Sequence, residues 1–238
     1  MALENEADLK VLTGGAFKRA LLALLPTYEA QSGRKVAVDN DTVGALTKRI
    51  EAGETFDVVI VSPSALDALA AAGKVVPGTK TPLAKVGIGV MVRNGAPAPD
   101  VGTVETFKQA VLAAKSVAYI DPASGGSSGV YLVKLLERLG LAEAIKDKVK
   151  LKRGGHVSDL IESGEAELGI HQISEILPAA GVTLVGPLPA EIQNYTVYAA
   201  AVGTAAHDPE AAKALIRSLA GPHAADVLKS KGMLPATA

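Results

Sequence analysis

Short runs of apolar and β-branched residues alternate with amphipathic stretches along most of this chain. The runs 9–12 and 36–38 flank a segment whose apolar residues recur at helical spacing. Phe56–Val61 is an almost uninterrupted apolar run, which is typical of a strand covered on both faces. Such alternation favours strand–helix–strand units with parallel pairing, so the sequence predicts an α/β fold with mostly parallel sheets flanked by helices.

The same pattern divides the chain into two series of elements. In the first series Pro26 should kink the helix that contains Phe17, or end its regular part, and Gly33 should then close the helix. A loop at 76–82 precedes a glycine-containing strand at 86–92, where we place the first crossover. The remaining expected helices are 44–52, 63–73, 104–113, 129–139, 157–163, 209–219 and 222–231, and the remaining strands are 116–120, one near Val149, 168–171 and 195–202. We therefore predict lobe I from residues 1–84 plus 196–238, and lobe II from residues 85–195.

Composition excludes several classes of function. With 24 Lys and Arg against 25 Asp and Glu, the formal charge is -1, so the chain lacks the cationic field that nucleic-acid binding needs. Cysteine is absent, which excludes disulfides and thiolate chemistry. The four histidines lack metal-ligand spacing. Aromatic residues make up 3% of the chain, which disfavours stacking platforms for sugars or single-stranded bases. We expect no metal, no cofactor and no nucleic-acid partner.

The first eight residues are polar and acidic, unlike the basic start and apolar middle of a signal peptide. An exported protein with this sequence would already have lost its signal. No apolar run approaches the roughly 20 residues needed to span a bilayer, so we expect no transmembrane segment.

Ligands of open α/β sheets collect where strands end and helices begin, so these turns are the candidate site. In the first turn, Gly14, Gly15 and Ala16 would let the backbone approach an anion closely, although an ordinary tight turn is an equal alternative. In the second, Thr42, Val43 and Gly44 open a helix, and Thr42 either caps that helix or donates to a ligand. Ser62 opens the following helix and joins the candidates.

The third turn, 121–129, is the most distinctive segment because it places three serines and three glycines between a strand and a helix. The N-terminus of this helix would offer N–H and O–H donors from Ser127, Ser128 and Gly129, which favours anion binding. The less favoured alternative is a flexible surface loop. The loop lacks the lysine and spacing of a P-loop, so nucleotides are not expected.

The fourth turn follows the strand that ends at His171 and Gln172. Gln172 would present an amide to a ligand, although either side chain would equally suit sheet packing. His156 and Val157 begin a further helix, where a solvated capping histidine is the commoner case and Val157 would offer its N–H.

Taken in order, these segments make the chain similar to the type II periplasmic binding proteins, in the branch that includes the molybdate-binding proteins of ABC transporters. The resemblance covers nearly the whole chain and rests on motifs at 11–17, 46–62, 121–131, 164–170 and 231–235. It implies two α/β lobes joined by two crossover strands, a ligand bound between them, a periplasmic location and an ABC permease as partner.

The resemblance also implies serine hydroxyls at the first two turns and a tyrosine at the fourth as molybdate ligands. Those positions are Ala16, Gly44 and Gln172 here. Each missing donor removes a buried charge-assisted hydrogen bond of about 1.5 to 3 kcal/mol. The smaller residues widen the site, and Thr42 and Ser128 are donors suited to carboxylates. We therefore expect a small organic di- or tricarboxylate rather than molybdate.

Two functions compete for this site. The favoured one is a receptor that captures an anion for a permease. The alternative is aconitate isomerase, an activity found on the same branch, which moves a proton along an allylic tricarboxylate without metal or cofactor. Candidate bases are His156, His171 and Asp121, although an aspartate before proline is often only a turn residue. Lys18 and Arg19 would add charge only if their helix pointed them inward. A regulatory effector-binding domain is a third possibility, but no DNA-binding segment is visible.

Overall fold

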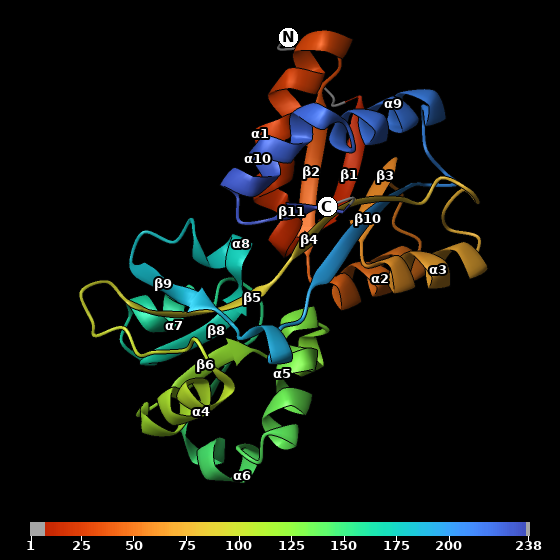
Figure 1. The fold of residues 1–238 in the computed structure, drawn as a ribbon. Coiled ribbons are helices and arrows are strands. Elements are labelled where there is room, and N and C mark those ends of the chain that lie inside the picture. The colour runs from red at the N-terminus through yellow and green to blue at the C-terminus, as the bar shows by residue number, and fades with distance from the viewer. Residues whose placement is uncertain (1–7, 237–238) are drawn as a thin grey trace, which may run out of the picture. The chain divides into compact units, whose positions relative to one another are not determined.

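The computed structural model describes residues 8–236 and divides them into two units (Figure 1). Unit 1 comprises the chain up to Lys85 and from Val197 onward, and unit 2 comprises Val86–Thr196. Residues 1–7, on which most of the expectation about a signal peptide rests, lie outside the described residues. Each unit has its own sheet with helices around it, so the predicted α/β class is confirmed.

The sheet of unit 1 has six strands in the order β11-β4-β10-β3-β1-β2. These strands are β1 Leu9–Gly14, β2 Val36–Asp41, β3 Val58–Val61, β4 Thr81–Val86, β10 Thr196–Val202 and β11 Leu234–Pro235. Strand β1 pairs in parallel with β2 and β3, whereas β10 runs antiparallel to β3. The carboxyl ends of β1, β2 and β3 therefore meet the beginning of β10 at one edge of the sheet.

Helices cover both faces of this sheet. They are α1 Gly15–Ser32, α2 Val43–Glu51, α3 Pro63–Ala71, α9 Pro209–Leu219 and α10 Pro222–Ser230. Leu12 of β1 packs with Leu46 of α2 and Leu66 of α3 in one apolar cluster. Helices α1, α9 and α10 contact one another (Figure 1). Because successive strand residues point to opposite faces, an apolar run such as Val58–Val61 serves both layers.

Pro26 lies inside helix α1, as the sequence predicted. The helix does not end there, and it continues to Ser32 before Gly33 closes it with a left-handed φ of 71°. Pro26 lies on the exposed face, and so does Leu22, whose carbonyl loses its usual N–H partner because proline has no N–H. On the opposite face, Leu21, Leu25 and other buried residues hold the helix against its unit through this interruption.

The sheet of unit 2 has five strands in the order β7-β6-β8-β5-β9. They are β5 Ile88–Arg93, β6 Val117–Ile120, β7 Val149–Lys152, β8 Leu168–Gln172 and β9 Val182–Pro187. The helices are α4 Val104–Ala113, α5 Ser127–Arg138, α6 Ala142–Ile145, α7 Ser158–Glu162 and α8 Ile173–Ile176, with 3-10 turns η1 Pro122–Ser124, η2 Lys146–Lys148 and η3 Ala190–Ile192. Strand β6 is parallel to β7 and β8, and β5 is antiparallel to β8.

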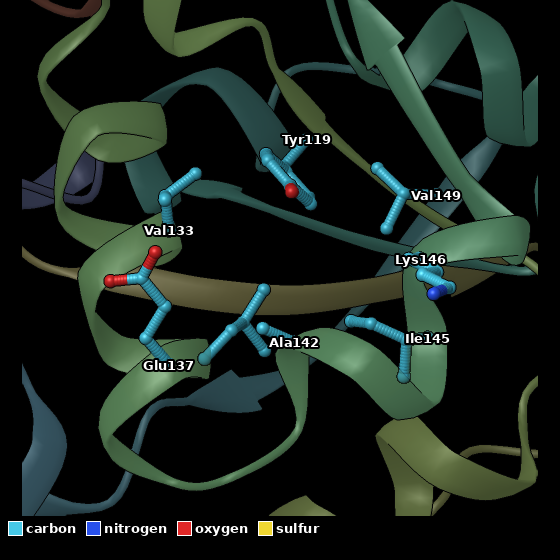
Figure 2. A pocket seen from close by; sticks show the side chains of 8 residues that line it. Tyr119, Val133, Glu137, Ala142, Ile145, Lys146 and Val149 are labelled. Carbon is cyan, nitrogen blue, oxygen red and sulfur yellow. The ribbon is translucent and has the colours of Figure 1, made fainter.

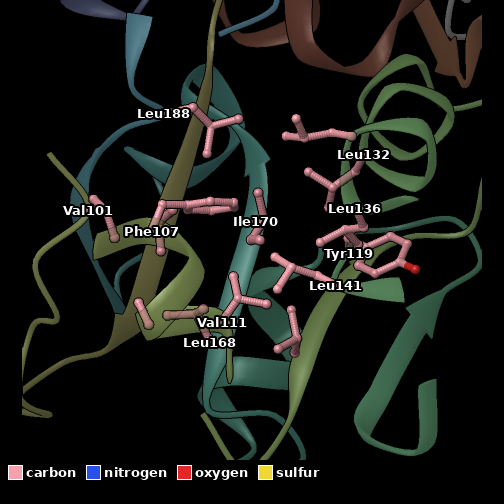
Figure 3. Close-up of a cluster of buried hydrophobic side chains, with 14 of the residues drawn as sticks. Val101, Phe107, Val111, Tyr119, Leu132, Leu136, Leu141, Leu168, Ile170 and Leu188 are labelled. Carbon is pink, nitrogen blue, oxygen red and sulfur yellow. The ribbon is translucent and has the colours of Figure 1, made fainter. Parts of the chain in front are cut away.

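Two apolar clusters lie on the two faces of this second sheet. Figure 3 shows Tyr119 of β6 and Ile170 of β8 packed with Phe107 of α4 and Leu136 of α5. Ala118 and Ile120, the alternate residues of β6, belong to the other cluster, which contains Ile161 of α7 and Ile176 of α8. The period of two along each strand therefore sorts its side chains between the two helical layers.

The expected strand 86–92 is instead two strands, β4 and β5, that meet at Gly87, so Thr81 and Pro82 belong to a strand rather than to the expected loop. The cause is visible at Gln193, whose amide accepts the N–H of Ile88 at 2.8 Å and donates to the carbonyl of Ile88 at 2.9 Å. A Cβ on Gly87 would lie 3.2 Å from the Gln193 side chain. Gly87 therefore lets this amide occupy the place of a neighbouring strand.

Candidate functional site

Three predicted turns of unit 1 lie at one edge of its sheet. Gly14 ends β1, Asp41 ends β2 and Ser62 directly follows β3. Since β1 is parallel to both neighbours, the turns after these strands share the carboxyl edge. The structure thus brings together the predicted residues Gly14–Ala16, Thr42–Gly44 and Ser62.

Tyr198 is a residue of this edge that the sequence analysis missed. A Cβ on Gly14 would lie 2.7 Å from the ring carbon Cε1 of Tyr198, so the glycine is needed for the ring to approach. The ring also packs against Phe17, with ring centroids 6.0 Å apart. The only available signal was the polar and aromatic start of the 195–202 run, because the contact depends on the antiparallel pairing of β10 with β3.

Two hydroxyls of unit 1 cap helices, and for Thr42 this agrees with the capping alternative. The Thr42 hydroxyl accepts the N–H of Ala45 at 3.2 Å at the start of α2, and the Ser62 hydroxyl accepts the N–H of Ala65 at 3.3 Å at the start of α3. The carboxylate of Asp41 accepts the N–H of Thr42 at 2.7 Å. Capping occupies an acceptor site on each hydroxyl, so it does not by itself prevent either from donating to a ligand.

In unit 2, helix α5 begins two residues earlier than predicted, at Ser127. The N–H of Val130 is the first to bond to a carbonyl of the helix start, that of Gly126 at 3.1 Å, so the helical pattern provides no partner for the N–H groups of Ser127, Ser128 and Gly129. A Cβ on Gly129 would lie 2.2 Å from the carbonyl oxygen of Ile120. Gly129 therefore lets these N–H groups sit directly beside the end of β6.

The Ser127 hydroxyl accepts two hydrogen bonds from its own unit. Gln172 Nε2 donates at 3.1 Å and Thr196 Oγ1 donates at 3.3 Å. A hydroxyl oxygen has two lone pairs and one hydrogen, so these two donors leave the Ser127 hydrogen to point elsewhere. Ser127 is half-buried, and it is thereby oriented as a donor. Thr196 was not predicted as part of the site.

The neighbouring Ser128 has different partners. Its hydroxyl lies 3.0 Å from Nδ1 of His171, and Nε2 of the same ring contacts the carboxylate of Glu175. The side chains of His171 and Glu175 are 7% and 13% exposed, so this is a buried hydroxyl–imidazole–carboxylate chain. Glu175 was missed by the sequence analysis, although its spacing of four residues from His171 was an available signal.

Asp121 has a structural role. Its carboxylate accepts the N–H of Ala123 at 2.9 Å and pairs with Nε of Arg153 at 2.8 Å. The bond from Ala123 and the guanidinium of Arg153 both hold the pKa of Asp121 below its usual range. A carboxylate with a lowered pKa is a weaker base, so Asp121 is poorly suited to remove a proton from carbon.

The remaining predicted residues lie elsewhere on α1 and before α7. His156 is exposed, and its carbonyl accepts the N–H of Asp159 at 3.2 Å. Val157 is fully buried among apolar side chains and precedes a helix of only five residues. Lys18 is half-buried and Arg19 is exposed on α1.

A separate pocket in unit 2 has a volume of about 230 Å³ (Figure 2). Its lining is Tyr119, Val133, Leu136, Glu137, Ala142, Ile145, Lys146 and Val149. Burial raises the pKa of the Tyr119 phenol, which therefore stays neutral. None of the predicted anion-binding residues lines this pocket.

Within residues 8–236, no helix is long and apolar enough to cross a membrane. Nor do the described residues include a group of three or more His, Cys, Asp or Glu that would hold a metal ion. The donors at both sheet edges are instead hydroxyls, amides and backbone N–H groups, which are suited to an anion.

Comparison with known proteins agrees with this fold. The family described as bacterial extracellular solute-binding protein matches residues 9–234. The chain is 34% identical to an aconitate isomerase of a Pseudomonas species over 244 aligned residues, which cover 100% of this chain and 92% of the relative. It is 25% identical to a molybdate-binding protein of Azotobacter vinelandii, covering 95% of this chain and 89% of that protein.

A solved structure has the same architecture. The periplasmic molybdate-binding protein of Azotobacter vinelandii superimposes with a TM-score of 0.80 at 21% identity, covering 95% of this chain and 98% of that one. At this identity the likeness concerns the fold alone.

Proposed function

Because this chain belongs to the bacterial extracellular solute-binding protein family, we propose that it binds a small organic di- or tricarboxylate, with aconitate as the expected ligand, and interconverts the cis and trans isomers of aconitate. The observation that carries the binding proposal is the donor set at the start of α5. It combines the oriented hydroxyl of Ser127 with three successive N–H groups of a twelve-residue helix. The positive end of the helix dipole stabilises an anion at the same place.

The side chains of the other turns favour a carboxylate over molybdate. Ala16 is a buried methyl group, Gly44 has no side chain, and Gln172 has its amide on Ser127. A desolvated tetrahedral oxyanion needs donors around all its oxygens, and each absent one costs about 1.5 to 3 kcal/mol. A polycarboxylate spreads its charge over several groups and matches donors grouped at separate turns.

Two observations support isomerisation. The relative at 34% identity, matched over the full chain, is an aconitate isomerase. In unit 2, moreover, the carboxylate of Glu175, whose side chain is 13% exposed, contacts the imidazole of His171. Proton transfer uses a carboxyl group beside an imidazole, whereas binding of an anion does not require one.

Capture of the anion for an ABC permease in the periplasm is the second candidate, and the family match supports it. Both candidates require the same carboxylate-binding residues. They differ in whether the ligand leaves the protein chemically changed.

The turns of unit 1, with Thr42 and Ser62, remain predicted ligand contacts. Replacing Thr42 by valine removes one hydroxyl with little change in volume. We expect weaker ligand binding from this change if the turn contacts the ligand, and unchanged binding if its hydroxyl only caps α2.

The test is thermal unfolding of the protein with molybdate, tungstate, sulfate, phosphate, citrate, cis-aconitate and trans-aconitate. A ligand at 100 times its Kd stabilises the folded state by about 2.7 kcal/mol. We expect stabilisation by a tricarboxylate and none by molybdate. Following the aconitate samples over time then separates the two candidates, since only an isomerase converts one isomer into the other.

A further inference from the structure

Both ring nitrogens of His171 are engaged inside unit 2. Nδ1 lies 3.0 Å from Oγ of Ser128, and Nε2 contacts the carboxylate of Glu175. The three residues come from different elements: Ser128 is the second residue of α5, His171 lies in β8, and Glu175 lies in α8. Parallel pairing of β6 with β8 places the turn before α5 beside the end of β8.

The partners determine where the hydrogen of the neutral ring lies. A carboxylate only accepts hydrogen bonds, so the assigned tautomer has its hydrogen on Nε2, facing Glu175. The lone pair of Nδ1 then faces Ser128, and the hydroxyl hydrogen of Ser128 points at the ring. A hydroxyl with a base behind it and a carboxylate behind that base is the arrangement by which proteins activate an oxygen atom.

We propose that Ser128, His171 and Glu175 form the proton-transfer chain of this site, an inference that rests on the proposed isomerase function. The C–H bond at the methylene carbon of aconitate breaks, and its proton goes to Oγ of Ser128 as the hydroxyl proton passes to Nδ1 of His171. The electron pair of that bond is delocalised over the allylic carbons and carboxylates. The reverse transfer then places one proton on the former vinylic carbon, and the double bond shifts by one position without any oxidant or reductant.

In this scheme Ser128 is the catalytic residue, because its oxygen meets the substrate. His171 and Glu175 are positioning residues that act through it. When His171 accepts the proton it becomes a cation, and the adjacent carboxylate of Glu175 stabilises that cation. After the proton has moved from one substrate carbon to the other, Ser128, His171 and Glu175 are thus back in their starting protonation states.

The geometry at Nε2 agrees with this role. Within the described residues this buried nitrogen contacts the Glu175 carboxylate but forms no aligned hydrogen bond. Hydrogen bonds of catalytic groups are often poorly aligned without ligand and tighten in the complex. A buried acid and base are also a poor way to stabilise a core, since apolar residues of similar volume serve at least as well.

The experiment follows trans-aconitate in D₂O by proton NMR, with the binding constant of each variant measured by calorimetry. The variants are Ser128→Ala, His171→Gln and Glu175→Gln, with Glu175→Asp as the conservative rescue. His223→Gln, an exposed histidine of α10, is the matched control. We expect the three disabling variants to lose about 10² to 10⁴-fold in kcat and in deuterium uptake while the Kd stays near that of the wild type. Glu175→Asp should recover part of the rate.

Three results would overturn this proposal. If the wild type isomerises aconitate and the disabling variants do so equally fast, Ser128, His171 and Glu175 have no part in proton transfer. The proposed isomerase function would still stand. If the wild type binds trans-aconitate without isomerisation or deuterium uptake, the proton-transfer role is refuted but carboxylate binding stands. If Kd rises while kcat at saturating aconitate stays unchanged, the three residues serve binding alone. Ser128→Ala removes a single oxygen atom, so it keeps the test available if His171→Gln does not fold.

Discussion

Removing the Ser127 hydroxyl is the sharpest perturbation of the proposed carboxylate site. Because Gln172 and Thr196 donate to both lone pairs of this oxygen, at 3.1 and 3.3 Å, its hydrogen is directed away from them. A charge-assisted hydrogen bond to a carboxylate contributes about 1.5 to 3 kcal/mol when buried. Ser127→Ala should therefore raise the Kd for a bound tricarboxylate by about 10- to 150-fold, since 1.4 kcal/mol is a factor of ten.

The assay is calorimetric titration of wild type and variant with trans-aconitate at fixed pH and salt. Ser163→Ala is the matched control, because that serine lies on an exposed turn and bonds to Glu165. Thr196→Val tests for a smaller loss of affinity. It removes one long donor and leaves the Ser127 hydroxyl in place, so the loss should be only about two- to threefold.

A Kd within twofold of wild type for Ser127→Ala would refute the reasoning. It would mean that the Ser127 hydrogen does not reach the ligand, whatever the hydroxyl accepts from its neighbours. An equal loss of affinity in Ser163→Ala would refute it as well, because the effect would then be general to the unit.

Two further predictions concern stability. Gly129→Ala should destabilise the fold by about 1 to 3 kcal/mol or more, because the new Cβ would lie 2.2 Å from the carbonyl oxygen of Ile120. The control is Gly186→Ala, whose Cβ would have its nearest neighbour at 3.6 Å and should cost far less. Thermal unfolding of both variants measures the difference. The hydrogen bond from Arg49 lowers the pKa of Glu54 from 4.5 to about 2. This lowered pKa adds stability above pH 4.5 that is lost as pH falls toward 2. Urea unfolding should therefore show Glu54→Gln less stable than wild type by about 1 kcal/mol at pH 7 and by progressively less in acid. A difference in the free energy of unfolding that grew in acid would contradict this.

Local pattern was sufficient to predict most elements. Helix α9 has the predicted bounds, Pro209–Leu219, because proline marks its start and its apolar period is regular. Strand β10 begins within one residue of its predicted start. Strand β9 was not predicted, because it is established only by its pairing with β5, some ninety residues away in sequence.

The candidate site shows the same division. The turns after β1, β2 and β6 were predictable because glycine and hydroxyl residues stand between strand and helix. Tyr198 beside Gly14, and Thr196 beside Ser127, depend on where β10 lies, which no local pattern reports. The preference for proline to interrupt a helix was outweighed at Pro26 by the buried face of α1.

The most direct test of the central claim is a calorimetric titration of the wild-type protein with trans-aconitate, repeated with molybdate present in excess. We expect saturable binding of about one aconitate per protein molecule, and molybdate should not displace it. Tight binding of molybdate, with no heat from aconitate, would contradict it.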